Sequence, residues 1–194
     1  MSALTGTYGE LIYTSLVAGA AKASFTTEVQ INDTTTMGVQ AHLPPDFWLP
    51  NNSAVGKTVR IVARGILAST GTPTYTFTVR GGASGATTGA ILLGSGALTT
   101  GSGVSAQIWE FEGEFVVKTM GAAGANTSGT GTGLLSSSGT ANKIDPIWGG
   151  GATPGTVTTL DTSITNYINF NVACSASSSS NTITLQSLQV YGLN

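Results

Sequence analysis

Charge is scarce in this sequence. Asp, Glu, Lys and Arg together make up 8% of its 194 residues, against about 25% in an average soluble domain. The formal net charge is −2, and the scattered cations form no basic patch, so we expect no nucleic acid among its partners. Weak charge also lowers the repulsion between protein surfaces, which favours association with other subunits.

Reactive and metal-binding side chains are scarce as well. Cys174 is the only cysteine and His42 the only histidine. One cysteine closes no disulfide within the chain, and zinc or iron sites need several clustered Cys, His or carboxylate ligands. We therefore predict no metal and no cofactor. A serine triad would need His42 as its base, and the chain contains no G-x-S-x-G nucleophile turn.

Long apolar runs are absent too. The longest are far shorter than the roughly 20 residues of a membrane-spanning helix, so we expect no membrane segment. Residues 11–23 faintly resemble the core of a signal peptide, but Glu10 precedes them where a positive charge is usual. We therefore predict an uncleaved product that is made in the cytoplasm.

Alternation of polar and apolar residues dominates the rest of the chain. Residues 74–80 (TYTFTVR) alternate without a break, and similar patterns occur at 57–68, 105–120, 168–174 and 182–191. A period of two is the main signal of half-buried β-strands. The inward faces are predicted to carry Val59, Ile61, Ala63, Leu67, Tyr75, Phe77, Val79, Trp109, Phe111, Phe115, Val117, Ile168, Phe170, Val172 and Cys174.

Local irregularities refine this prediction. The last strand slips phase between Leu185 and Leu188, which indicates a β-bulge near Gln186–Ser187. Gly113 stands on the apolar face of its strand, where another backbone or an aromatic ring could approach. Two short strand candidates are residues 25–31 and 37–43. Three stretches rich in Gly, Ser and Thr are predicted to be loops, at 81–89, 121–140 and 149–156.

Eight or nine short strands predict an all-β fold, an antiparallel β-sandwich. A jelly-roll is the favoured arrangement. An immunoglobulin-like sandwich is the second, although its Cys…Trp…Cys spacing is missing. We expect one sandwich domain at residues 25–194, preceded by an N-terminal arm at residues 1–24. The arm either lies across a neighbouring subunit or forms an ordinary edge strand followed by a loop.

Glu110, Glu112 and Glu114 are the strongest candidates for catalysis. Alternate residues on a strand point the same way, about 7 Å apart, and inverting glycosidases use a similar carboxyl separation. The same stripe is also typical of a solvated strand face, and Arg60, Arg64 or Arg80 on neighbouring strands could pair with it. An open face lacks the apolar pocket that a general acid needs. We therefore predict a structural face and no enzyme activity.

Aromatic residues supply the candidate interface. Phe47 and Trp48 are predicted to stand in a proline-braced loop, LPPDFWLPNN, and Trp148 in a similar loop, DPIWGGG. Such tryptophans serve as interface anchors, as sugar-stacking platforms or as plugs at the end of a sandwich core. Tyr8 and Tyr13 in the N-terminal arm complete the set of candidate interface residues.

The order of these segments resembles a known pattern. GKTVRIVARGILASTGTPTYTFTVRGG (56–82), followed by IWEFEGEFVVKTMG (108–121), is similar to small virion structural proteins of tailed bacteriophages. The match covers about residues 39–125, and the stretch 121–140 does not align. The resemblance implies a β-sandwich that decorates or cements the capsid, commonly as a homotrimer, while similar proteins belong to tails.

These observations lead to one expected function and two alternatives. The expectation is a capsid decoration protein on the virion surface, with the major capsid protein and copies of itself as partners. It would be synthesised in the host cytoplasm and would stabilise coat-subunit contacts by interface burial and by strand addition through the arm. A tail or fibre component that binds a receptor is the first alternative. A polysaccharide-degrading enzyme, resting on the glutamate stripe alone, is the second.

Overall fold

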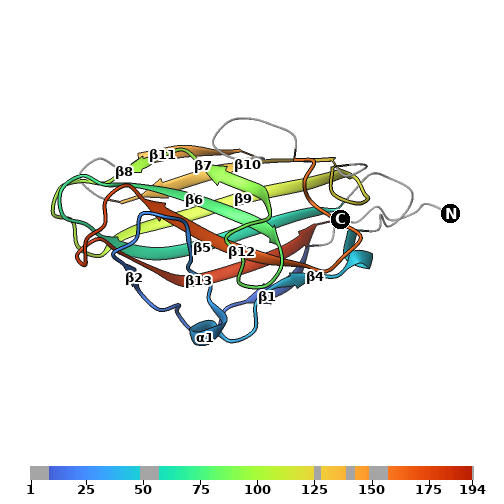
Figure 1. Ribbon diagram of the computed structural model, residues 1–194, viewed down its shortest axis with the longest axis horizontal. Helices are drawn as coiled ribbons and strands as arrows, with labels where there is room; N and C mark the ends of the chain where they lie inside the picture. The colour runs from blue at the N-terminus through green and yellow to red at the C-terminus, as the bar shows by residue number, and fades with distance from the viewer. Residues whose placement is uncertain (1–8, 49–56, 125–127, 139–142, 149–156, 194) are drawn as a thin grey trace.

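The computed structural model describes residues 9–48, 57–124, 128–138, 143–148 and 157–193. Within them the chain forms thirteen antiparallel strands, stacked as two layers (Figure 1). The first layer contains β1 (Gly9–Thr14), β2 (Lys22–Ala23), β13 (Thr182–Leu193), β5 (Thr58–Ala68), β9 (Gln107–Thr119) and β10 (Ser128–Ser137). The second contains β7 (Ala90–Ser95), β6 (Thr74–Gly82), β8 (Leu98–Thr99), β12 (Asn166–Cys174), β4 (His42–Leu43) and β3 (Val29–Gln30).

Hydrogen bonds connect the two layers into one path. The order is β1-β13-β5-β9-β10-β11-β7-β6-β12-β3, and β11 (Lys143–Trp148) joins the layers. β11 pairs with β10 over six residue pairs but with β7 over only two. The predicted antiparallel β-sandwich is therefore confirmed, while the jelly-roll connectivity stays a prediction.

Helical structure is limited to two short turns in the described part of the chain. These are α1 (Thr34–Met37) and the 3-10 turn η1 (Pro45–Trp48). Asp33 caps α1, because its side-chain oxygen accepts a hydrogen bond from the Thr36 amide. No helix among the described residues is both long and apolar enough to span a bilayer.

The core lies between the layers and is rich in aromatic side chains. Trp109 of β9 stacks on Phe170 of β12, with ring centroids 5.9 Å apart and planes 13° from parallel. Phe111 meets the edge of the same ring at 5.0 Å, and Phe77 of β6 lies 4.9 Å from Trp109. Burying an aromatic ring of this size contributes about 3 kcal/mol. All fifteen residues predicted to face inward are buried.

The predicted bulge in the last strand is confirmed. The register between β13 and β5 shifts between Leu185 and Ser187, so Gln186 is the extra residue. The shift allows both Leu185 and Leu188 to face the core, where each is fully buried.

The prediction that residues 121–140 form a loop is wrong for residues 128–137, which form β10. β10 pairs with β9 along its whole length. The sequence of β10 lacks the polar–apolar alternation that marks a strand, because three alternate positions on its inner face are glycines: Gly129, Gly131 and Gly133. A Cβ atom at Gly129 would lie 2.3 Å from the Phe115 ring, and one at Gly133 would lie 2.2 Å from the Glu112 carbonyl oxygen. The glycines therefore make room for β9 and its side chains.

Two further predictions need correction. Trp148 does not stand in a loop, because its backbone ends strand β11; its side chain, and residues 149–156, lie outside the described residues. The strand candidates 25–31 and 37–43 shrink to β3 and β4, with α1 between them. We call residues 25–43 the strap, because β3 and β4 pair with the edge of β12 opposite β6. Its side chains Glu28, Gln30 and Gln40 reach the outer face of β12.

The N-terminal segment is part of the chain's own sheet from residue 9 onward. β1 pairs antiparallel with β13, and β2 continues along the same edge. Between them the Ser15 and Gly19 amides donate to the Leu188 and Leu185 carbonyls. The observed pairing thus corresponds to the edge-strand alternative for residues 9–23. A domain boundary at residue 24 stays a prediction, and residues 1–8 lie outside the described part.

Candidate functional site

The glutamate stripe lies on the outer face of the first layer, which we call the open face. Cross-strand register aligns the side chains in rungs: Arg64–Glu110–Ser136, Val62–Glu112–Leu134 and Arg60–Glu114–Thr132 across β5, β9 and β10. Ile66–Ile108 and Thr58–Val116 continue the ladder at its two ends. Alternation along each strand places every second residue on this face. A column of arginines therefore runs beside a column of glutamates.

Ion pairs connect the two charged columns. Arg64 Nη2 lies 2.6 Å from Glu110 Oε1, and its Nε also donates to this oxygen at 2.9 Å. Arg60 donates to Glu112 on the neighbouring rung and lies 4.0 Å from Glu114. The Glu112 carboxylate raises the pKa of Arg60. Arg60 and Arg64 were predicted partners of the stripe, and the structure confirms both.

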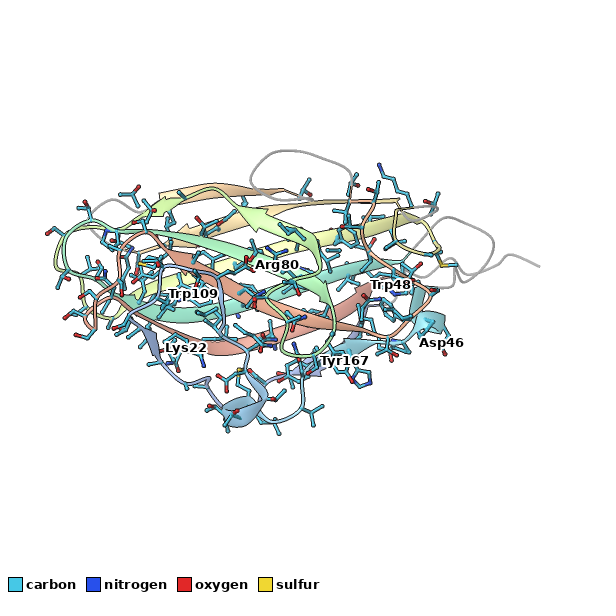
Figure 2. The ribbon with its side chains drawn as sticks, viewed as in Figure 1. Lys22, Asp46, Trp48, Arg80, Trp109 and Tyr167 are labelled. Carbon is cyan, nitrogen blue, oxygen red and sulfur yellow. The ribbon has the colours of Figure 1, made fainter. Side chains whose placement is uncertain are left out.

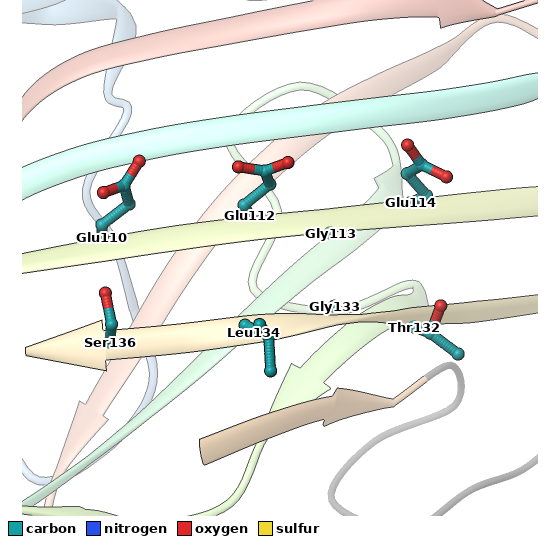
Figure 3. Close-up of a pocket in the computed structure, with 8 residues that line it drawn as sticks. All are labelled: Glu110, Glu112, Gly113, Glu114, Thr132, Gly133, Leu134 and Ser136. Atoms are coloured by element: carbon teal, nitrogen blue, oxygen red, sulfur yellow. The ribbon is translucent and has the colours of Figure 1, made fainter. Parts of the chain in front are cut away.

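A shallow hollow of about 430 Å³ lies between the glutamate column and β10. Figure 3 shows the three carboxylates leaning toward β5, away from Thr132, Leu134 and Ser136. The floor consists of the backbone at Gly113 and Gly133. A carboxyl that acts as a general acid needs an apolar pocket that raises its pKa. Each glutamate side chain of the stripe is instead 38–47% exposed. The arrangement offers paired charges, hydroxyls and one exposed leucine.

Arg80 does not join this stripe, contrary to one of the predicted pairings. It lies on β6 in the other layer, where its Nε and Nη2 donate to Glu28 of the strap at 2.7 and 2.8 Å (Figure 2). Thr78 and Asn171 donate to the same carboxylate. Burial alone would raise the pKa of Glu28, but these hydrogen bonds and the Arg80 charge outweigh it and lower the pKa below 4.5.

The strap and residues 83–86 bury two asparagines, which lie on the face of β12 opposite Ile168 and Phe170. Asn169 and Asn171 of β12 are fully buried. Asn169 accepts hydrogen bonds from Gln40 at 2.6 Å and from Gln30 at 3.3 Å. Asn32 donates to the Ile168 carbonyl at 2.8 Å and accepts from the Phe170 amide. A strand with alternating Asn residues can thus be covered on both sides when a polar segment supplies the partners.

The candidate interface residues occupy different environments. Trp48 is fully buried toward one end of the core (Figure 2), which corresponds to the core-plug alternative, and a role in an interface stays a prediction. Phe47 is half-buried, contacts the Trp48 ring edge-on at 5.0 Å and lies beneath the Lys57 ammonium at 4.8 Å. Tyr13 is partly buried in β1, and this burial raises its pKa. Tyr8 and the Trp148 side chain lie outside the described residues.

The remaining reactive residues lie apart from the open face. Cys174 is buried, as predicted, and its thiol donates to the Ala176 carbonyl. His42 is exposed on β4, beside the Tyr167 ring. Among the described residues, no group of three or more His, Cys, Asp or Glu side chains could hold a metal ion. A second hollow, of about 510 Å³, is lined by Pro45, Asp46, Met120, Gly121, Thr162 and Ser163.

Comparison with known proteins gives little similarity. No protein-family model matches the chain, and no curated protein matches it. Among solved structures, the chain is similar to the CBM2 module of Lactobacillus casei BL23 phage J-1 evolved Dit. The match covers 97% of both chains at 12% sequence identity and a TM-score of 0.35. A likeness at this level carries no argument about function.

Proposed function

We propose that this chain is a non-catalytic structural protein of a tailed-bacteriophage particle, and that it decorates the outside of the head. The resemblance of residues 39–125, in order and spacing, to phage virion proteins supports a structural role in the phage particle. The same resemblance includes proteins that decorate the head, which supports the head location, as well as proteins that belong to tails. The major capsid protein is the proposed partner, and the chain would stabilise the shell by bridging neighbouring coat subunits.

The main support for a non-catalytic role is that arginines of β5 pair with the glutamate stripe. Glu110 and Glu112 are each bonded to an arginine of β5 on an open sheet face. Carboxylates held in this way balance charge across strands and present a continuous surface. Such a surface supports binding of another protein better than it supports proton transfer.

Copy number per particle tests the location. Quantitative mass spectrometry of purified virions would compare this chain with the major coat protein. A ratio near that of the coat protein supports decoration of the head. A small fraction of the coat number contradicts it and moves the chain to the tail or a vertex. Absence from the particle overturns the virion assignment altogether.

A tail component that binds a glycan is the second candidate. The hollow beside the glutamates favours it, because carboxylates and the Thr132 and Ser136 hydroxyls can exchange hydrogen bonds with sugar hydroxyls. A phage carrying Thr132→Val and Ser136→Ala would then adsorb more slowly while its heads keep their stability. Unchanged adsorption would contradict this candidate.

Replacing Glu110, Glu112 and Glu114 together by Gln distinguishes both non-catalytic candidates from an enzyme that degrades polysaccharide. Under the non-catalytic proposal, purified wild-type and triple-variant chains release equally little reducing sugar from host-surface polysaccharide. Release by the wild-type chain that the triple variant lacks would make the stripe catalytic and overturn the proposal.

A further inference from the structure

The two outer faces of the sandwich differ in what covers them. The strap and residues 83–86 cover the part of β12 where Asn169 and Asn171 are fully buried. On the open face, Ile66, Ile108 and Leu134 remain 36%, 58% and 57% exposed. These three residues lie on the adjacent strands β5, β9 and β10. Segments of the chain itself therefore cover one polar face, while no segment among the described residues covers these three side chains of the open face.

We propose that the open face binds the open face of a second copy of this chain, around a two-fold axis parallel to the strands. The proposal rests on the charge and apolar pattern of this face, and it does not depend on the phage assignment. It also differs from the homotrimer that the sequence resemblance implies, since the contact is closed by two copies.

Charge complementarity argues for a second copy as the occupant. The open face carries Arg60 and Arg64 in one column and Glu110, Glu112 and Glu114 in the next, with Lys118 beyond the last rung of β9. A two-fold rotation about an axis that runs between β5 and β9 places β5 of one copy over β9 of the other. Arg64 then faces Glu110 of the second copy, and Arg60 faces Glu114. Glu114, which is 4.0 Å from Arg60 within its own chain, gains a second guanidinium.

The apolar residues follow the same symmetry. Ile66 and Ile108 are directly opposite each other on β5 and β9, so the rotation places Ile66 of each copy over Ile108 of the other. A two-fold axis that lies in the interface plane but runs perpendicular to the strands would instead place each β5 over β5 of the second copy. This arrangement brings Arg64 near Arg60 of the second copy. Like charges in contact disfavour that alternative. The pattern thus selects one axis direction.

The size of the face indicates the class of interface to expect. The five rungs, extended to β13 on the other side of β5, cover four strands and span roughly 25 Å by 15–20 Å. Two such faces bury about 1,000 Å² in total, which is at the lower limit of specific interfaces. We therefore expect a reversible dimer that forms at micromolar or higher concentration and weakens as salt rises.

Charge reversal with mixing tests the proposal. Variant A carries Arg60→Glu and Arg64→Glu, and variant B carries Glu110→Arg and Glu114→Arg. Sedimentation equilibrium of the full chain should show a wild-type dimer, and each variant alone should associate at least about tenfold more weakly because like charges face each other. An equimolar mixture of A and B should recover a one-to-one dimer.

Recovery in the mixture distinguishes a lost interface from a damaged fold. Circular dichroism of each variant checks the fold directly, and Glu10→Arg with Asp46→Arg provides a matched reversal at exposed sites outside the two columns. This control should dimerise like the wild type. A monomeric or trimeric wild type, a dimer that persists in variant A, or folded variants that do not associate on mixing would each overturn the proposal.

Discussion

Single glycines determine how closely the two strands beneath the hollow approach each other. Gly113 of β9 and Gly133 of β10 are directly paired. A Cβ atom at Gly133 would lie 2.5 Å from the Gly113 Cα atom. The same Cβ atom would also lie 2.2 Å from the Glu112 carbonyl oxygen. No side-chain rotation can relieve these two contacts, since both neighbouring atoms belong to the backbone. Glycine at this position is therefore a packing requirement.

Replacing Gly133 should destabilise the protein. We expect Gly133→Ala to lower the free energy of unfolding by about 1–3 kcal/mol, because the added methyl group forces β9 and β10 apart. Urea denaturation followed by tryptophan fluorescence measures the change. Gly96→Ala is the matched control, since a Cβ there meets no atom within 4 Å. Equal stability of both variants would contradict the packing role.

The sequence predicted a close approach at Gly113 but not at Gly133. At Gly113 the nearest group is the Leu93 side chain, 2.8 Å from the position of a Cβ atom, where a backbone or an aromatic ring was predicted. Gly113 stands between Phe111 and Phe115, so its position on the apolar face is evident from its neighbours. Gly133 stands in a stretch of Gly, Ser and Thr with no apolar alternation to mark its face. Only the pairing of β10 with β9 shows which of these glycines face inward.

The strap is the element whose attachment depends most on charge. Glu28 accepts hydrogen bonds from Arg80, Thr78 and Asn171 and thereby fixes the strap to β6 and β12. Asp33 contributes similarly: burial alone would raise its pKa, but Lys22 at 2.9 Å and the Thr36 amide lower it below 3.8. Both carboxylates favour the folded state in their charged form.

The Glu28 contribution should disappear in acid. Its pKa is lowered by folding, so its stabilisation is present above the unfolded value of about 4.5 and is lost as pH falls through the folded value. Glu28→Gln should reduce stability at pH 7 by about 1–3 kcal/mol, because Arg80 keeps its partly buried charge without an opposite charge beside it and retains only its bond to the Gly89 carbonyl. The difference from the wild type should shrink below pH 4.5.

Chemical denaturation between pH 3 and pH 7 measures this difference. Glu10→Gln serves as the control, because it removes a carboxylate from an exposed position of β1 and should change stability by less than about 0.5 kcal/mol. A Glu28→Gln variant as stable as the wild type at pH 7 would show that the ion pair does not hold the strap.

At the scale of the whole molecule, one core connects both layers. The buried cluster includes Phe25 of the strap, Trp48 of η1 and Val190 of β13, together with the central strands. Elements at both ends of the sequence thus share one hydrophobic core. Segments that share a core usually unfold together.

We therefore expect a single cooperative unfolding transition. Far-UV circular dichroism and tryptophan fluorescence should give the same midpoint in urea, since the two fully buried tryptophans lie toward opposite ends of the molecule (Figure 2). An early, separate loss of strand signal would instead indicate that the N-terminal segment unfolds independently, as an arm would.

The sequence by itself determined the strands with clear alternation, their inward faces and the bulge in β13, because alternation is a local property of neighbouring residues. Its alternation also indicated that the glutamate stripe faces outward. The tertiary structure decided which strands are neighbours, and with this the arginine that each glutamate meets, the strand hidden among glycines and the burial of Asn169 and Asn171. These outcomes depend on contacts between residues far apart in the chain, which no local pattern encodes.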